Sequence, residues 1–160
     1  YNLPIATIRP FNTYGPRQSS RAVIPTIITQ ALTQKSVKLG SLSPTRDFTF
    51  VTDTVRGFIK MAESSNNIGE TINIGSNFEI SINDVAQKIA KLLELDIDLE
   101  IKDQRKRPEK SEVTRLYADN TKAKSLLGWE PQLTLDEGLL LTIEWIKKNI
   151  ELYNTNEYTI

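Results

Sequence analysis

The sequence contains neither cysteine nor histidine among its 160 residues. The lack of thiols excludes disulfides and a cysteine nucleophile, and the lack of imidazoles excludes a histidine base and a zinc site of the usual ligands. An excess of one charge is also lacking, since 20 Lys and Arg balance 20 Asp and Glu. Nucleic acids and anionic membranes bind basic surfaces, so neither is expected as a partner. Any functional site must use Arg, Lys, Asp, Glu, Asn, Ser, Thr or Tyr.

Long apolar runs are absent too, so neither a transmembrane helix nor a secretory signal is predicted. The seven glycines stand at positions 15, 40, 57, 69, 75, 128 and 138, and neither G-x-G-x-x-G nor a Walker loop can be drawn through them. None of the five tyrosines is followed by a lysine four residues later. The sequence therefore carries no dinucleotide fingerprint and no Tyr-x-x-x-Lys pair.

What the sequence does contain is an alternation of short strands and amphipathic helices. Apolar or β-branched runs predict strands, and capping residues followed by apolar positions at helical spacing predict helices. The predicted strands are Ile5–Ile8, Val37–Leu39, Phe48–Val51, Thr71–Ile74 and Ile97–Ile101. The predicted helices begin near Ile24, after Thr52 or Asp53, after Ser81, after Asp119 and at Leu135. Gly128 is predicted to end the helix that begins after Asp119. This alternation predicts an α/β or α+β fold.

Two of these elements carry further information. Residues 5–8 predict a buried strand, which needs neighbouring strands and suggests a fragment of a larger protein. In the helix after Asp53, Val55, Phe58, Ile59 and Ala62 form one apolar stripe. We expect an isolated chain of this kind to expose apolar sheet edges and to associate.

Five motifs follow one another along the chain. They are Arg9–Gln18, Thr45–Asp53, Ile72–Ser76, Arg107–Val113 and the segment from Asp119 to Pro131. In this order and spacing they resemble the C-terminal half of the extended short-chain dehydrogenases that act on nucleotide sugars, the NAD-dependent epimerase and dehydratase family. Segments 17–18, 40–47 and 107–112 are most similar to UDP-N-acetylhexosamine 4,6-dehydratases of the legionaminic-acid type.

The resemblance implies a fold and an activity. The fold would be α/β: a substrate-binding lobe plus the last strands of a Rossmann-like doubly wound sheet whose N-terminal half, with the NAD loop and the Tyr-x-x-x-Lys pair, is absent here. Residues 1–150 would be the substrate-binding portion and 151–160 a flexible tail. NAD would be bound mainly by the absent half, and no catalytic residue is assigned in this chain. The chain alone is predicted to be inactive, and the full-length protein to be a cytoplasmic homodimer.

The resemblance also implies roles for individual residues. Pro10 and Phe11 match the stretch beside the nicotinamide ring, and Asn12 matches an amide that binds the substrate diphosphate. Among the other substrate-binding assignments, Arg46 matches a diphosphate contact, and Arg107 matches a contact to the diphosphate or the ribose. An acid is assigned to the ribose and three apolar residues to the uracil: Glu112, Val23, Ile24 and Leu39. Glu112 departs from the family pattern, because it stands five residues after Arg107 rather than about three.

The chemistry of these residue types agrees with such a site. Planar guanidinium groups give a diphosphate parallel charge-assisted bonds, a carboxylate accepts ribose hydroxyls, and apolar side chains cover a base. Each residue also has an ordinary interpretation: Arg46 and Asp47 as a surface pair, Asn12 as a turn residue, and 102–110 as a solvated face. Two other functions remain open, a UDP-hexose 4-epimerase and a non-catalytic nucleotide-binding or interaction module.

Overall fold

The computed structural model describes residues 3–34, 36–105 and 112–153. The chain divides into two compact units, each assembled from three segments. Unit 1 comprises Tyr1–Tyr14, Arg46–Glu79 and Leu116–Leu135; unit 2 comprises Gly15–Thr45, Ile80–Arg115 and Asp136–Ile160. No helix within the described ranges has both the length and the apolar character needed to cross a bilayer.

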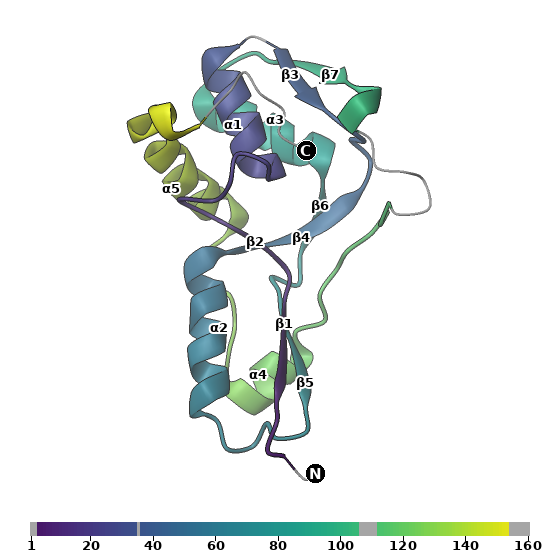
Figure 1. Cartoon of the computed structure of the whole chain (residues 1–160), viewed down its shortest axis with the longest axis vertical. Helices are drawn as coiled ribbons and strands as arrows, with labels where there is room; N and C mark the ends of the chain where they lie inside the picture. The colour runs from purple at the N-terminus through teal and green to yellow at the C-terminus, as the bar shows by residue number, and fades with distance from the viewer. Residues whose placement is uncertain (1–2, 35, 106–111, 154–160) are drawn as a thin grey trace. The chain divides into compact units, whose positions relative to one another are not determined.

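Unit 1 is built on parallel strand pairs. Strand β1 (Thr7–Pro10) pairs in parallel with β5 (Thr71–Ile74), and β2 (Asn12–Tyr14) pairs in parallel with β4 (Thr45–Phe50). Helices α2 (Val51–Glu63) and α4 (Thr121–Leu127) pack on the β1–β5 pair and on each other (Figure 1). Parallel strands joined through helices confirm the predicted α/β class.

A single apolar cluster holds α2, β5 and α4 together. Its buried members are Met61, Ile72, Ile74, Ala123, Leu127 and Trp129. Gly57 lets α2 approach β5 closely, because a Cβ there would stand 3.0 Å from side-chain carbons of Ile74. Trp129 is fully buried, and its indole N–H donates to the carbonyl of Asp53 at 3.0 Å. Trp129 is therefore a core residue of unit 1.

The apolar stripe of α2 does not face this cluster. Val55, Phe58 and Ile59 are 51%, 46% and 50% exposed, and Ala62 is exposed as well. The helix instead turns Asp53, Thr54, Gly57 and Met61 inward. The side of α2 that satisfies the apolar pattern is therefore left uncovered by the described residues.

The first strand also differs from its prediction. It begins at Thr7 rather than at Ile5, and the Ile5 side chain is 58% exposed. The physical reason is that β1 pairs on one edge with β5 and has no partner strand on its other edge among the described residues. The strand predicted to be buried is thus open along one edge among the described residues, and three of its four residues are exposed.

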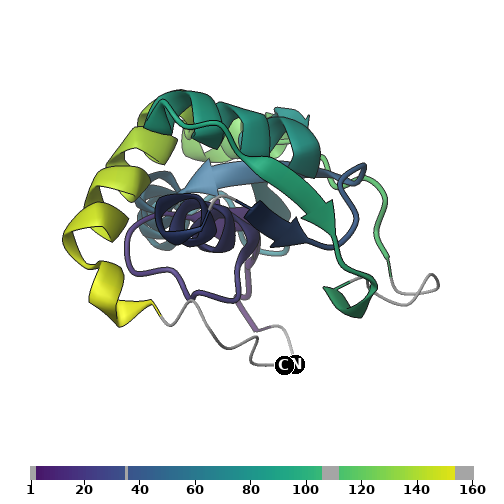
Figure 2. The same ribbon diagram turned by 90° about the horizontal axis from the view of Figure 1, so that it is seen from above.

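Unit 2 packs helices on a second parallel pair. Strand β3 (Ser36–Leu39) pairs with β7 (Asp98–Ile101), as Figure 2 shows from above. Helix α1 (Val23–Thr33) packs on β3 and on α3 (Ile82–Leu93). The remaining elements are the short strand β6 (Glu79–Ser81), the 3₁₀ turn η1 (Asp103–Arg105) and helix α5 (Leu135–Lys148). Side chains buried in this unit include Ile24, Ile27, Ile28, Val37, Leu39, Val85, Ile89, Ile143 and Ile146.

The helix ends agree with three local predictions and correct two others. Ser81 caps α3 by accepting the Asp84 N–H at 3.0 Å, α5 begins at Leu135, and Gly128 ends α4 with φ at 57°. One correction concerns α4, which begins at Thr121 with Asn120 rather than Asp119 at the cap position. The other concerns α2, which begins at Val51, with Phe50 rather than Thr52 or Asp53 at the cap position. The Asp53 carboxylate instead accepts N–H groups from residues 132 and 133.

A short turn follows α5 near the C-terminus. Residues Ile150–Leu152 form a 3₁₀ turn (η3), and Tyr153 is buried. The Tyr153 hydroxyl donates to the Gln18 carbonyl at 3.1 Å, and its ring meets Trp145 edge-on at 5.9 Å between ring centroids. The tail predicted over 151–160 stays a prediction, since residues 154–160 lie outside the described ranges.

Candidate functional site

Asn12 lies where strand β2 begins, directly after the end of β1. It stands opposite Phe48 in the parallel register with β4, and its side chain is half-buried. Its amide nitrogen Nδ2 is buried and has no hydrogen-bond partner among the described residues. Burying an amide donor without an acceptor costs free energy, so an acceptor supplied by a ligand would stabilise this position.

Pro10 and Phe11 occupy the turn between β1 and β2. Pro10 is the last, exposed residue of β1, and Phe11 is half-buried. The Phe11 N–H donates to the Ile74 carbonyl at 2.9 Å, and its own carbonyl accepts from the Thr13 hydroxyl at 3.2 Å. These two hydrogen bonds hold the backbone of Phe11 between β1 and β2.

Arg46 and Asp47 lie on β4 and have unequal environments. Arg46 is half-buried, whereas Asp47 is fully buried. One Asp47 oxygen accepts from the N–H and the hydroxyl of Ser76, both at 2.7 Å, and the other accepts from the Ala118 N–H at 3.2 Å. Asp47 is therefore a junction between three segments, and the surface-pair interpretation does not describe it.

The segment after Ala118 is tied to β5 by polar bonds as well. The Asn120 amide donates to the Gly75 carbonyl at 2.9 Å, and the Asn73 amide donates to the Asp119 carbonyl at 3.2 Å. The hydroxyl and the N–H of Thr121 donate to the Asp119 carboxylate, which lowers the pKa of that carboxyl. These bonds hold residues 118–121 against the carboxyl end of β5.

Tyr14 is the last residue of β2, two positions after Asn12. Its burial indicates that it packs beneath the loop and does not face a ligand. It is 2% exposed, and its hydroxyl donates to the Leu135 carbonyl at 3.1 Å. Its ring meets Phe48 and Phe50 edge-on, with centroids 6.1 Å and 5.5 Å away. Tyr14 therefore stabilises the loop from beneath.

The remaining assigned residues belong to unit 2. Val23, at the start of α1, is half-buried, while Ile24 and Leu39 are buried core residues at 1% and 4% exposure. Of these three, Val23 has the most accessible side chain. Glu112 is half-buried, and Arg107 lies outside the described residues.

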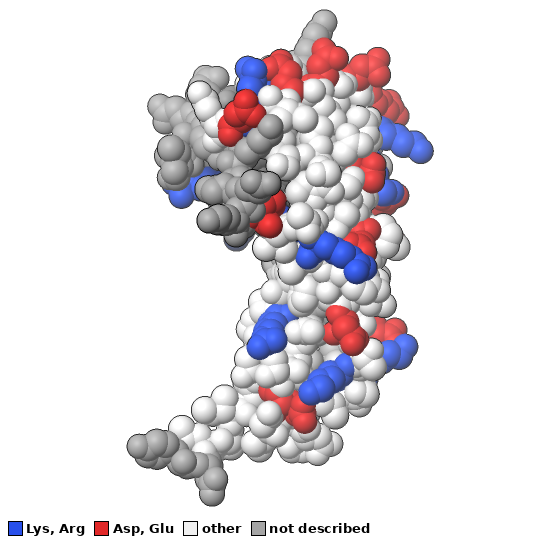
Figure 3. Space-filling model, turned by 90° about the vertical axis from the view of Figure 1, so that its right-hand side faces the viewer, with Lys and Arg blue, Asp and Glu red and all other residues white. Residues whose placement is uncertain are grey.

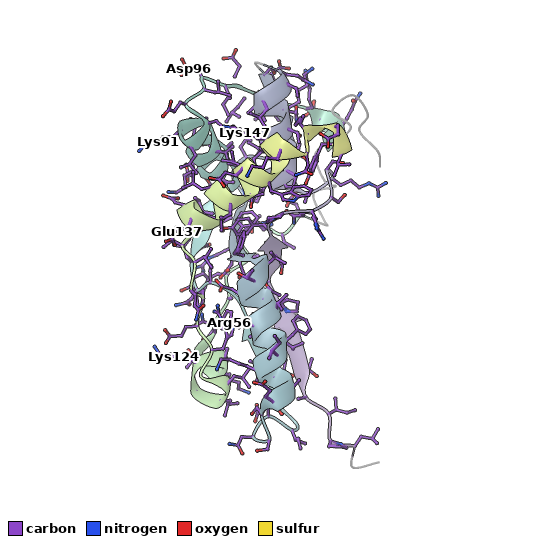
Figure 4. The ribbon with its side chains drawn as sticks, turned by 90° about the vertical axis from the view of Figure 1, so that its left-hand side faces the viewer. Arg56, Lys91, Asp96, Lys124, Glu137 and Lys147 are labelled. Atoms are coloured by element: carbon purple, nitrogen blue, oxygen red, sulfur yellow. The ribbon has the colours of Figure 1, made fainter. Side chains whose placement is uncertain are left out.

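A polar network on the inner side of α2 was not predicted from the sequence. One oxygen of the buried Asp53 accepts the N–H groups of Gln132 and Leu133 at 3.0 and 3.1 Å, and the other pairs with Arg56 at 2.8 Å. Arg56, labelled in Figure 4, also donates to the Glu130 carbonyl at 2.7 Å. No signal in the sequence indicated this network, because the apolar spacing predicted a buried face at Val55, Phe58, Ile59 and Ala62 and Asp53 was interpreted as a possible helix cap.

Charged side chains of both signs share the face of the molecule in Figure 3. Basic and acidic groups are interspersed there, and uncharged surface lies between them. Ion pairs such as Lys122–Glu70 and Lys102–Glu100 join exposed side chains. Exposed pairs of this kind contribute little to stability. The part of this face that the structure describes carries no broad basic surface.

The sequence of the chain matches a known protein family and several known proteins. The family model described as "GDP-mannose 4,6 dehydratase" matches residues 1–142. A UDP-glucuronate 4-epimerase of Thermodesulfobacterium geofontis is 37% identical over 155 residues, which cover 95% of this chain and 46% of the relative. The chain spans about half the length of the curated relatives it matches.

Two solved structures are similar in fold as well as in sequence. The UDP-glucuronic acid 4-epimerase of Bacillus cereus, in complex with UDP-glucuronic acid and NAD, is 33% identical with a TM-score of 0.84 over 92% of this chain and 46% of its own. The dTDP-glucose 4,6-dehydratase of Bacillus anthracis, in complex with NAD, is 32% identical with a TM-score of 0.82 over 96% of this chain and 48% of its own. Epimerases and dehydratases are thus about equally similar to the chain.

Proposed function

The chain belongs to the family of NAD-dependent nucleotide-sugar epimerases and dehydratases, and on that basis we propose that it is the UDP-sugar-binding part of a nucleotide-sugar 4,6-dehydratase. UDP-N-acetylglucosamine is the proposed substrate, by the likeness of segments 40–47 and 107–112 to dehydratases of the legionaminic-acid type. The observation that carries the proposal is the buried Nδ2 of Asn12, an amide donor without an acceptor among the described residues.

In this proposal three side chains bind the diphosphate. The Asn12 amide donates to a phosphate oxygen, and the guanidinium groups of Arg46 and Arg107 neutralise the charge of the two phosphates. Glu112 accepts the ribose hydroxyls, and Val23, with Ile24 and Leu39 behind it, covers the uracil. Charged groups thus fix the diphosphate while apolar groups accommodate the base.

The residues present fit one part of an NAD molecule. Phe11, whose backbone makes two hydrogen bonds at the end of β1, offers an apolar wall that a nicotinamide ring can contact, with Pro10 beside it. The chain has no glycine-rich loop for the pyrophosphate, so these two residues would contact NAD at its ring end only. When bound, NAD supplies the hydride acceptor for the sugar, and this chain's contribution is to orient the substrate.

A UDP-sugar 4-epimerase is the second candidate, because the 37% identical relative is named a UDP-glucuronate 4-epimerase. The two reactions differ in their products. A dehydratase removes one water from the sugar, whereas an epimerase inverts one carbon and leaves the mass unchanged. Mass spectrometry of the product that the whole enzyme forms from UDP-N-acetylglucosamine distinguishes the two reactions. We propose that the whole enzyme is a cytoplasmic homodimer. The isolated chain is proposed to be inactive in both cases.

The proposal is tested by calorimetric titration of the chain with UDP, with UDP-N-acetylglucosamine and with uridine. We expect UDP and the UDP-sugar to bind more tightly than uridine, because the diphosphate carries the charged contacts. Arg46→Ala and Arg107→Ala should abolish the difference between UDP and uridine. Arg9→Ala, which removes an exposed arginine of β1, is the control for loss of one positive charge. A folded chain that binds none of the three ligands contradicts the proposal.

A matched pair of asparagines tests the Asn12 contact itself. Asn12→Asp replaces the amide donor by an anion of the same shape and should prevent UDP binding. Asn66→Asp adds the same charge at an exposed position of unit 1 and should leave the UDP affinity unchanged. Equal effects of the two substitutions would show that charge alone, and not the contact, weakens binding.

A further inference from the structure

Asp47 is a fully buried carboxylate that the proposed binding chemistry does not use. It lies on β4 between Arg46 and Phe48, and Phe48 is the residue that pairs with Asn12 in the parallel register. Of the residues assigned to the diphosphate, Arg46 is therefore its neighbour along β4, and Asn12 lies on β2 opposite the next residue of β4. The position of Asp47 in the fold links it to the proposed site without a contact to the ligand.

Its hydrogen bonds are matched to a carboxylate. Three donors converge on its two oxygens: the N–H and hydroxyl of Ser76 on Oδ1, each at 2.7 Å, and the N–H of Ala118 on Oδ2 at 3.2 Å. An ionised carboxylate has acceptor capacity on both oxygens, whereas an amide of the same shape has it on one. The site is thus specific for aspartate and not only for a polar side chain.

The three segments that meet at Asp47 are also packed without spare room. A Cβ on Gly75 would stand 2.2 Å from the Cβ of Ala118, 3.3 Å from Oδ2 of Asp47 and 3.3 Å from Cγ of Phe11. The aromatic side chain of Phe11 is therefore seated on the junction formed by these residues. A shift of Asp47 or of residues 75–76 must move Phe11, whose neighbour in the chain is Asn12.

A second buried aspartate supplies the contrast. Asp53 is as completely buried as Asp47 and also accepts two backbone N–H groups, from Gln132 and Leu133. Neither these two residues nor its ion-pair partner Arg56 is next to a residue assigned to the ligand. Asp53 therefore stabilises the fold of unit 1. A comparison of the two aspartates distinguishes a residue that only stabilises the fold from one that also positions ligand-binding residues.

We propose that Asp47 is a positioning residue for the diphosphate: by joining the segments that follow β5 and precede α4 to β4, it sets the places of Arg46, Asn12 and Phe11. The proposal rests on the proposed UDP-sugar function. The Asp47 carboxylate only accepts hydrogen bonds, and by accepting three of them from Ser76 and Ala118 it holds in place the neighbouring groups that bind an anion. The ligand class whose affinity should depend on Asp47 is a nucleoside diphosphate.

The test is a calorimetric titration of the chain with UDP in wild type, Asp47→Asn and Asp53→Asn. In Asp47→Asn an N–H₂ group faces one of the N–H donors, and we expect the UDP affinity to fall about tenfold or more, equivalent to about 1.4 kcal/mol. Asp53→Asn should lower the unfolding midpoint but leave the UDP affinity within about twofold of wild type. Ser76→Ala, which removes one of the three bonds, gives a milder variant should Asp47→Asn fail to fold.

A double-mutant cycle supplies a readout that a purely structural role would not move. If Asp47 acts by placing Arg46, the loss of affinity caused by Asp47→Asn (or by Ser76→Ala) shrinks in an Arg46→Ala background, whereas Asp53→Asn shows no such coupling. The positioning role would be overturned by an unchanged UDP affinity in Asp47→Asn, by equal losses of UDP affinity in both aspartate variants, or by additive effects of Asp47→Asn and Arg46→Ala. None of these three results would contradict the UDP-sugar function. A wild-type chain that does not bind UDP overturns the proposed function first, and the positioning role with it.

Discussion

The two units differ in which side of a helix they bury. Each packs helices on a pair of parallel strands, β1–β5 in unit 1 and β3–β7 in unit 2. In unit 2, α3 turns its apolar residues inward, and Val85 and Ile89 are completely buried. In unit 1, α2 turns an aspartate, a threonine, a glycine and a methionine inward and leaves its apolar stripe exposed.

An apolar stripe therefore identifies the face of a helix that requires a partner and not the partner itself. Unit 2 supplies that partner from its own chain segments, so its core is apolar. Unit 1 is fastened to a larger extent by buried carboxylates, Asp47 and Asp53, which accept backbone N–H groups from distant segments. Four sets of substitutions test this contrast between the units.

The strongest destabilisation is expected from the two tryptophans. Trp129→Ala in unit 1 removes a fully buried indole and its hydrogen bond to Asp53, and should lower the free energy of unfolding by about 4 kcal/mol. Trp145→Ala in unit 2 removes a half-buried indole and should cost about half as much. Urea unfolding measures both, and equal losses would contradict the central place of Trp129 in unit 1.

The next effect concerns the buried carboxylate of α2. Asp53→Asn weakens the bonds to Gln132, Leu133 and Arg56 and should lower the free energy of unfolding by about 2 kcal/mol. The matched change in unit 2 is Asp84→Asn, which alters an exposed carboxylate at the start of α3. It should cost about 0.5 kcal/mol or less. If the two losses were the same, unit 1 would not depend on its buried acid as described.

A third prediction addresses the exposed stripe. Phe58→Glu places a charge on a 46% exposed position of α2 and should change the free energy of unfolding by about 0.5 kcal/mol or less. It should nevertheless reduce self-association of the chain, because the stripe is an apolar surface without a cover among the described residues. Leu140→Glu, at a 42% exposed position of α5 in unit 2, is the control. Sedimentation equilibrium measures association, and unchanged association in Phe58→Glu would contradict the prediction.

The smallest expected effect is a pH dependence of the free energy of unfolding, to which one exposed carboxylate in each unit contributes. Bonds from Lys102 and Ser36 lower the pKa of Glu100, and those from Thr121 lower the pKa of Asp119. Because the folded pKa is below the unfolded one, each contribution is present above about pH 4 and is lost as the pH falls through the folded value. Urea unfolding at neutral and acid pH should show that Glu100→Gln and Asp119→Asn differ from wild type at neutral pH and converge with it in acid.

Much of the fold could be predicted because its signals are local. Strand β5 has the predicted bounds Thr71–Ile74, Ser81 caps α3, and Gly128 ends α4 in the left-handed conformation. Each of these depends on a few neighbouring residues, whose conformational preferences act whatever the rest of the chain does. The short strands β2 and β6 have no such signal, since three residues cannot show a period, and neither was predicted.

The candidate site was predicted less completely, because its arrangement depends on residues far apart in the sequence. Asp47 meets Ser76 across 29 positions and Ala118 across 71. No local pattern shows which distant N–H groups a carboxylate will accept. The motif around Arg46 drew attention to this segment, but only the structure shows that the aspartate beside it is the buried junction.

The UDP-sugar assignment can be tested at a single group by observing the side-chain amide of Asn12 while UDP is added. In ¹H–¹⁵N correlation spectra the resonance of this NH₂ group can be assigned by its loss in Asn12→Asp. We predict that it shifts progressively and saturably with UDP, because Nδ2 gains an acceptor that it lacks among the described residues. The amide of Asn66 is the internal reference and should not move. An unchanged Asn12 resonance in a folded chain at high UDP concentration would contradict the account.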